Sequence, residues 1–172
     1  MPLQQLYSAY LGELYGIAFF TAFAQKYSND SHINKWQHLI QVEQITANRL
    51  KNGLEAANYP CPSQDDEMEN KGLEDAEKWL GLDWPTLIDT MIPWVEPYAL
   101  RYREQAAAAT EHKELFELVQ AHEDAIYEFL LAEQHENDSG LAILADFIAA
   151  YAPTSPSSAQ CTPHSTKTQP EK

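Results

Sequence analysis

The sequence predicts an all-α protein, an antiparallel four-helix bundle with one long crossover and extra short helices. The 172-residue chain holds only six glycines, and its ten prolines fall mainly at segment boundaries and in the C-terminal tail. Long uninterrupted segments therefore remain. Along them, apolar residues recur every three or four positions, which is the period of an amphipathic helix. The bundle is expected over residues 1–152, and a disordered tail rich in Ser, Thr and Pro over residues 153–172.

The first half of the chain predicts two long helices joined by a short turn. The first covers about residues 3–27, and the polar run at 28–31 ends it. The second starts there, with Asp30 or Ser31 as its cap, and keeps its apolar period to Leu54. Two long helices joined in this way must lie antiparallel. Residues 58–72, which contain the acidic run from Asp65 to Glu69, are expected to be an exposed crossover.

The second half of the chain predicts a second pair of long helices. After a short helix at 73–80, Asp83 and Pro85 mark the start of a long helix that reaches about residue 109. Pro93 and Pro97 lie inside this segment, so a kink or a split near Pro93 is expected. Another long helix is expected at 110–134 and a short closing helix at 139–151.

The charge of the chain limits its partners. Twenty-six Asp and Glu residues against 11 Lys and Arg residues give a formal net charge of −15. This charge repels nucleic-acid phosphates and anionic lipid, so no nucleic acid and no membrane partner is expected. The apolar run at 17–24 is too short to span a bilayer and has no basic residue before it as a signal peptide would. A cytoplasmic location is therefore expected.

Each long helical segment has one glutamate at the centre of its apolar stripe. These residues are Glu13, Glu43, Glu96 and Glu123. An unpaired buried carboxylate is strongly unfavourable, so four converging ones need cations or protons between them. The separation of Glu13 from Glu43 is similar to that of Glu96 from Glu123, which places each pair near one level of a helical hairpin. The sequence therefore predicts a two-metal carboxylate site.

With these glutamates, the helix lengths and the crossover, residues 3–134 resemble the ferritin-like, rubrerythrin-like superfamily of four-helix di-iron carboxylate proteins. The resemblance implies a ferritin-like bundle, two iron or manganese ions and a role in oxygen, peroxide or metal handling. It gives Glu13 and Glu96 the place of the single glutamates on the first and third helices. It gives Glu43 and Glu123 the place of the glutamates in the two Glu-x-x-His motifs.

The chain departs from this family at both expected histidines. Thr46 and Ile126 stand three positions after Glu43 and Glu123. His122 is the only plausible nitrogen ligand, although it lies about 100° around the helix from Glu123. Four carboxylates with one imidazole still suit iron or manganese. Whether the chain is an enzyme stays open at this point.

A metal-free core is the alternative interpretation. The four glutamates would then pair with Arg49, Arg103, His122 or tyrosine hydroxyls, with no cofactor bound. The chain would in that case be a helical-bundle interaction protein that has lost its metal site.

Two further expectations concern ligands and assembly. If a metal is bound, an apolar pocket beside it would admit oxygen or a small apolar ligand. Leu14 and Leu131 are expected on exposed helix flanks, where they would permit a homodimer.

Overall fold

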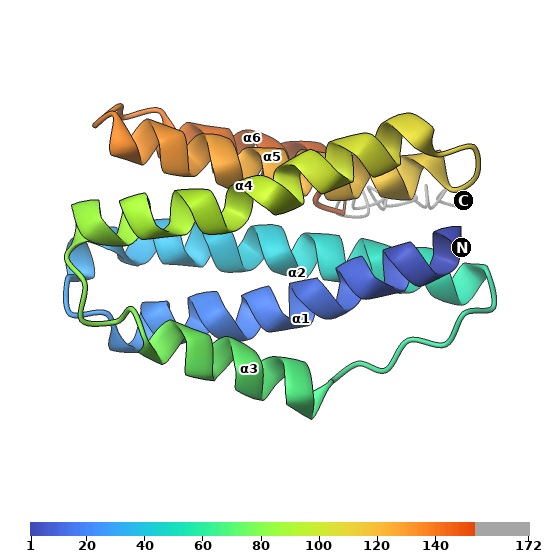
Figure 1. The fold of residues 1–172 in the computed structure, drawn as a ribbon, viewed down its shortest axis with the longest axis horizontal. Helices are drawn as coiled ribbons and strands as arrows, with labels where there is room; N and C mark the ends of the chain where they lie inside the picture. The colour runs from blue at the N-terminus through green and yellow to red at the C-terminus, as the bar shows by residue number, and fades with distance from the viewer. Residues whose placement is uncertain (154–172) are drawn as a thin grey trace, which may run out of the picture.

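The computed structural model describes residues 1–153, and over this range the protein is all-α (Figure 1). The expected tail, apart from Pro153, lies outside the described residues. Residues 1–153 form six α-helices and one short 3-10 helix, with no strand. The elements are α1 (Pro2–Lys26), η1 (Asp30–His32), α2 (Ile33–Ala56), α3 (Asp66–Glu77), α4 (Trp84–Ala108), α5 (Lys113–Gln134) and α6 (Gly140–Tyr151). Within this range, none of the helices has an apolar stretch long enough to cross a membrane.

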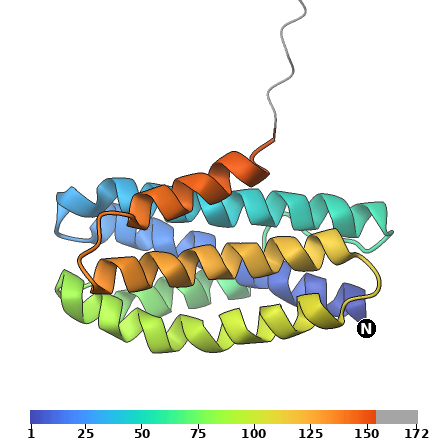
Figure 2. The same ribbon diagram turned by 90° about the horizontal axis from the view of Figure 1, so that it is seen from above.

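The four long helices form two antiparallel hairpins. α1 packs against α2, and α4 packs against α5. The hairpins meet chiefly where α2 contacts α5, and α6 covers both of these helices, as the turned view in Figure 2 shows. α2 ends at the opposite end of the molecule from the start of α4, so the chain between them must return along its whole length (Figure 1). An extended segment makes the first part of this return and α3 the next (Figure 1), and among the helices the backbone of α3 approaches only α1.

Side-chain caps set the starts of α3 and α4. The carboxylate of Asp83 accepts a hydrogen bond from the backbone N–H of Thr86 at 3.0 Å, as expected for the start of α4. Asp65 accepts from the N–H of Met68 in the same way. The prediction that the acidic run is an exposed linker is therefore wrong in part, because it caps and begins α3, seven residues before the expected start at 73. Carboxylates in a first helical turn are stabilised by the partial positive charge there.

Two other element boundaries differ from the predictions. The side chain of Asn29, rather than Asp30 or Ser31, accepts from the N–H of Ser31 and caps η1, the turn before α2. α4 is one continuous helix with Pro93 and Pro97 inside it, so of the two expected outcomes, a kink or a split near Pro93, the split is absent from the described chain. The ribbon of α4 bends along its length instead, as helices with internal prolines do (Figure 1).

The two leucines expected to form an exposed dimer surface are not exposed. Leu14 is buried, and Leu131 is half-buried. The prediction that both leucines lie exposed is therefore wrong, because the helices that pack beside α1 and α5 already cover these positions.

One largely buried glutamate joins three helices at the end of the molecule where α4 begins. Glu133 of α5 accepts a hydrogen bond from Lys35 of α2 at 2.6 Å and another from the indole N–H of Trp84 in α4 at 3.1 Å. The side chain of Glu133 is 9% exposed. This contact fixes the two hairpins relative to each other, which in turn fixes the residues that face one another between them.

Candidate functional site

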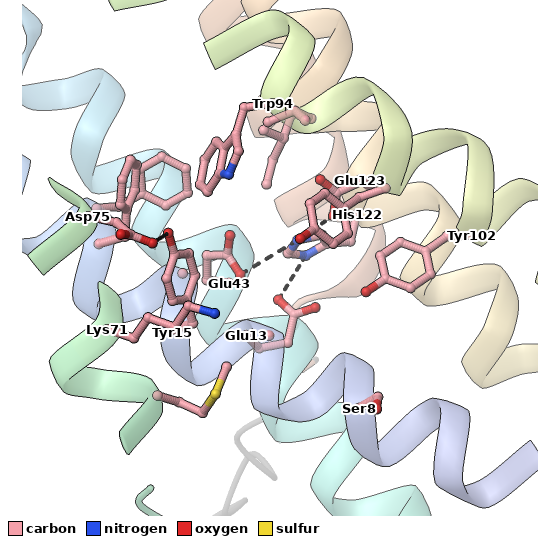
Figure 3. Close-up of a pocket in the computed structure, with 18 of the residues that line it drawn as sticks. Ser8, Glu13, Tyr15, Glu43, Lys71, Asp75, Trp94, Tyr102, His122 and Glu123 are labelled. Carbon is pink, nitrogen blue, oxygen red and sulfur yellow. Dashed lines mark hydrogen bonds and ion pairs between the residues drawn. The ribbon is translucent and has the colours of Figure 1, made fainter. Parts of the chain in front are cut away.

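Three ionisable side chains from three different helices meet in the interior. Glu13 of α1, Glu43 of α2 and His122 of α5 are 3%, 5% and 2% exposed. Nδ1 of His122 lies 3.2 Å from Oε2 of Glu13, and Nε2 lies 3.5 Å from Oε2 of Glu43, as the dashed lines in Figure 3 mark. One potential ligand atom from each residue lies within 4.8 Å of the other two. Such a set of carboxylate and imidazole groups has the composition and the compactness of a metal site.

The hydroxyl of Thr46 determines which nitrogen of His122 is free. Thr46 is fully buried, and its Oγ1 donates to the carbonyl oxygen of Val42, one turn earlier in α2, at 2.9 Å. Oγ1 also lies 3.0 Å from Nδ1 of His122. Since the hydroxyl hydrogen is already used, Thr46 accepts from Nδ1–H, and the proton of the neutral ring resides on Nδ1. Nε2 is then left with a free lone pair, which is the form of imidazole that binds a metal.

A glycine on α1 makes room for one of the carboxyl groups. A Cβ atom at Gly16 would lie 2.5 Å from Cδ and Oε1 of Glu43. Glycine costs about 1 kcal/mol relative to alanine inside a helix. Its presence here is explained by the carboxyl group of Glu43, which occupies the space that a side chain would fill.

The interior position shifts the pKa values of all these groups. Burial, together with the neighbouring Glu43, raises the pKa of Glu13 well above its ordinary value. Burial raises the pKa of Glu43 to about 7, although a hydrogen bond with Glu13 opposes this shift. Burial lowers the pKa of His122 to about 3. Without a cation, the carboxyl groups therefore tend to hold protons at neutral pH, and the contacts of His122 are those of a neutral ring.

Glu123 extends the cluster on the α5 side. Its Oε2 lies 3.8 Å from Nε2 of His122, and its side chain is 14% exposed. Burial and the nearby Glu43 raise the pKa of Glu123 to about 8. The free lone pair of Nε2 thus lies close to both Glu43 and Glu123. Oε2 of Glu13 is buried and has no hydrogen-bond partner among the described residues. Such an atom is expected where a cation or a proton binds.

The expectation that Glu96 points at the core is wrong. Glu96 is exposed on α4, and the buried side of this helix carries Met91, Val95 and Ala99 instead. The expected stripe through position 96 lies one residue away from the buried one, and one residue is a rotation of about 100° around a helix. Of the five predicted ligands, the structure therefore brings together Glu13, Glu43, His122 and Glu123 and leaves Glu96 outside.

The arginines named for a metal-free core have other partners. Nε of Arg103 donates to Asp124 at 2.8 Å, and Nε of Arg49 donates to the carbonyl oxygen of Tyr151 at 2.6 Å. Among the described residues, the buried glutamates of the cluster instead contact His122, which was also considered for the metal-free core.

A pocket of about 360 Å³ opens beside the cluster. α1, α3 and α4 line it, and Glu43 of α2 and His122 and Glu123 of α5 also reach it (Figure 3). Glu13, Glu43, His122 and Glu123 all belong to its lining. The cluster is therefore buried but accessible through the pocket to a small molecule.

Tyr102 and Asp75 at this pocket were not found by reading the sequence. Tyr102 of α4 is half-buried, and burial together with Glu123 and Glu13 raises its pKa. The hydroxyl of Tyr15 donates to Asp75 of α3 at 2.7 Å and so joins α3 to α1 beside the pocket. Gly16 left a signal in the sequence, since a glycine inside a helix lowers its stability and is usually explained by packing or function.

Comparison with known proteins identifies no relative: no family model, no curated protein and no solved structure matches the chain.

Proposed function

We propose that this protein binds a divalent transition-metal ion among Glu13, Glu43, His122 and Glu123. We propose further that it acts in oxygen, peroxide or metal handling, as a variant of the ferritin-like di-iron proteins with fewer metal ligands. The convergence of three buried ligand groups from α1, α2 and α5, each with a ligand atom within 4.8 Å of the others, carries this proposal. The bare Nε2 of His122, the unpartnered Oε2 of Glu13 and the space left by Gly16 support it.

The donor set favours one ion over two. The di-iron family uses four glutamates and two histidines for its pair of metals. With Glu96 outside, three carboxylates and one imidazole remain here. Oxygen donors with one imidazole suit Fe²⁺ or Mn²⁺. The resemblance to ferritin-like proteins is also supported by the two antiparallel hairpins and the long return connection through α3.

The metal-free bundle is the competing state, and the raised pKa values of Glu13, Glu43 and Glu123 favour it at low pH. In that state protons take the place of the cation. The chain would then serve as a helical interaction protein with a polar core.

Metal titration of chelator-treated full-length protein separates the two states. Anaerobic Fe²⁺ or Mn²⁺ is added near pH 8, and binding is followed by calorimetry and by metal analysis after gel filtration. We expect one ion per chain and a melting temperature about 5–10 °C higher at a hundredfold excess over Kd. The loaded protein is then assayed for consumption of oxygen and of hydrogen peroxide.

Matched glutamine variants locate the site. Glu43→Gln should abolish stoichiometric binding, whereas Glu96→Gln, the same change at an exposed glutamate, should retain it. If the wild-type protein binds no ion and its melting temperature does not change when metal is added, the metal-free state is established and the proposal is refuted. Binding that survives Glu43→Gln but not Glu96→Gln would place the metal elsewhere and equally refute it.

A further inference from the structure

The entrance of the pocket carries two positive charges that form no ion pair with any residue of the described range 1–153. Lys71 of α3 and Arg101 of α4 both line the pocket, and the amino group of Lys71 points toward its interior in Figure 3. Within residues 1–153 neither side chain forms an ion pair. This is notable in a chain with 26 acidic residues and only 11 Lys and Arg residues.

The carboxylate on which the charge of Lys71 acts is shared with other partners. Asp75 lies one turn further along α3, but its two oxygens are engaged: Oδ2 by the hydroxyl of Tyr15 at 2.7 Å and Oδ1 by Lys78 at 2.8 Å. Arg101 contacts the ring of Tyr98, 5.3 Å from its centroid. The positive charges of Lys71 and Arg101 thus remain available to an anion at the pocket entrance.

Apolar surface lies behind these two charges. Phe19 and Phe20 of α1 and Trp94 of α4 form part of the lining, and the rings of Phe19 and Trp94 have their centroids 5.0 Å apart. A volume of about 360 Å³ is at the small end for a ligand pocket. These dimensions suit a molecule with one ring or a short chain.

A second glycine on α1 keeps this space open. Gly12 lines the pocket one turn before Gly16, and a Cβ atom at Gly12 would have no neighbour within 4 Å. No packing contact therefore requires glycine here, although glycine costs about 1 kcal/mol relative to alanine in a helix interior. A side chain at this position would project into the pocket and take the room of a ligand.

We propose that this pocket binds a small organic anion, a monocarboxylate with an apolar or aromatic body, whose charged group lies between Lys71 and Arg101 and whose body lies along Phe19 and Trp94. The inference goes beyond the proposed metal binding and does not rest on it, because the two cations and the apolar wall belong to the protein with or without an ion. A charged hydrogen bond at a partly exposed site gives the carboxylate its preference over neutral analogues.

Calorimetric titration of the chelator-treated full-length protein with phenylacetate tests the proposal, with phenylacetamide as the uncharged probe of equal shape. We expect one phenylacetate per chain and at least about tenfold weaker binding of the amide. Lys71→Gln and Arg101→Gln should each weaken phenylacetate binding about five- to tenfold. Lys26→Gln is the matched control, because it removes the same charge from α1 outside the pocket, and it should leave Kd unchanged.

A blocking variant tests the location independently of charge. Gly12→Leu should abolish phenylacetate binding while circular dichroism shows a melting temperature at or above that of the wild type, since leucine favours the helix. The proposal is overturned if no phenylacetate binding is detected at ligand concentrations up to about 10 mM, since a specific site should have a Kd well below this. It is also overturned if the amide binds as tightly, or if neither cation variant changes Kd. Since the protein is metal-free throughout, failure of metal binding would not produce these results.

Discussion

The hydroxyl of Thr46 lies 3.0 Å from Nδ1 of His122 and joins the buried imidazole of α5 to the backbone of α2. Position 46 is where the ferritin-like pattern would place a histidine of its own. At this position α2 therefore contributes a hydrogen-bond partner for His122 of α5 and no imidazole ligand of its own. It fixes both the orientation of the ring and the nitrogen that carries the proton.

Replacing Thr46 tests this support. Thr46→Val keeps the shape but leaves Nδ1–H of His122 without its hydroxyl acceptor, so we expect a loss of about 1–3 kcal/mol in the free energy of unfolding. Metal affinity should fall about tenfold or more, because the ring is no longer held. Thr46→Ser keeps the hydroxyl and serves as the control in urea unfolding and metal titration. Equal affinities for the valine and serine variants would contradict the role given to Thr46.

A pair of alanine variants on α1 tests the space beside Glu43. Gly16→Ala places a methyl group 2.5 Å from the carboxyl group of Glu43, and this flexible end must move away. Metal affinity should therefore fall about tenfold or more, since a displaced ligand loses its position. Gly12→Ala is the same change four residues earlier, where nothing lies within 4 Å, and it should keep the affinity and raise stability by about 0.5–1 kcal/mol. Unaltered metal binding in both variants would show that Glu43 is not a ligand.

The stability of the metal-free protein should fall as the pH rises from 6.5 to 8. The pKa values of Glu43 and Glu123, about 7 and about 8, lie above those in the unfolded chain. In this range the folded state therefore holds protons that the unfolded state has lost, and each such proton lowers the free energy of unfolding by about 1.4 kcal/mol per pH unit. The pKa of His122, lowered to about 3, acts in the opposite direction, but only below about 6.5.

Urea unfolding at several pH values measures this slope. Glu123→Gln removes one of the retained protons, so the variant should lose stability less steeply than the wild type above pH 6.5. Parallel slopes for the two proteins would mean that Glu123 is ionised in the folded state.

The contact at Glu133 should contribute measurably to stability. Glu133→Gln weakens the hydrogen bonds with Lys35 and Trp84 and leaves the amine of Lys35 without a counter-charge. We expect a loss of about 1–3 kcal/mol in the free energy of unfolding, because the contact is largely buried. Glu55→Gln disrupts the more exposed pair with Lys51 and should cost less than about 0.5 kcal/mol. Similar losses for the two variants in thermal unfolding would contradict the difference in burial.

The helices and much of the cluster follow from apolar periodicity, and the failure at Glu96 shows its limit. In α1, α2 and α5 most positions of the predicted stripe are buried, so Glu13, Glu43 and Glu123 could be placed near the core from the sequence. α4 also carries apolar residues outside its buried side, such as Tyr98 and Leu100, which are exposed. Two stripes one residue apart then compete, and periodicity does not decide between them.

The arrangement around His122 could not have been predicted in the same way. His122 and Glu123 point in directions about 100° apart, and both face the cluster because α5 contacts α1 on one side and α2 on another. This depends on how the hairpins are rotated against each other. The placement of Lys71 and Arg101 at one pocket likewise depends on where α3 lies. The sequence predicted a linker at residues 58–72 and so did not predict this position.

Within residues 1–153, α3 makes its helix contacts with one neighbour alone. Its backbone approaches only α1, and the contact includes the hydrogen bond from Tyr15 to Asp75 and the close approach of Gly72 to the carbonyl oxygen of Tyr15. A short helix held by a single neighbour can detach while the two hairpins stay folded, at a lower free energy than global unfolding requires. The amide hydrogens of α3 should therefore exchange with solvent before those of the two hairpins. The size of molecule that reaches the buried glutamates is then set by this opening equilibrium rather than by the volume of the closed pocket.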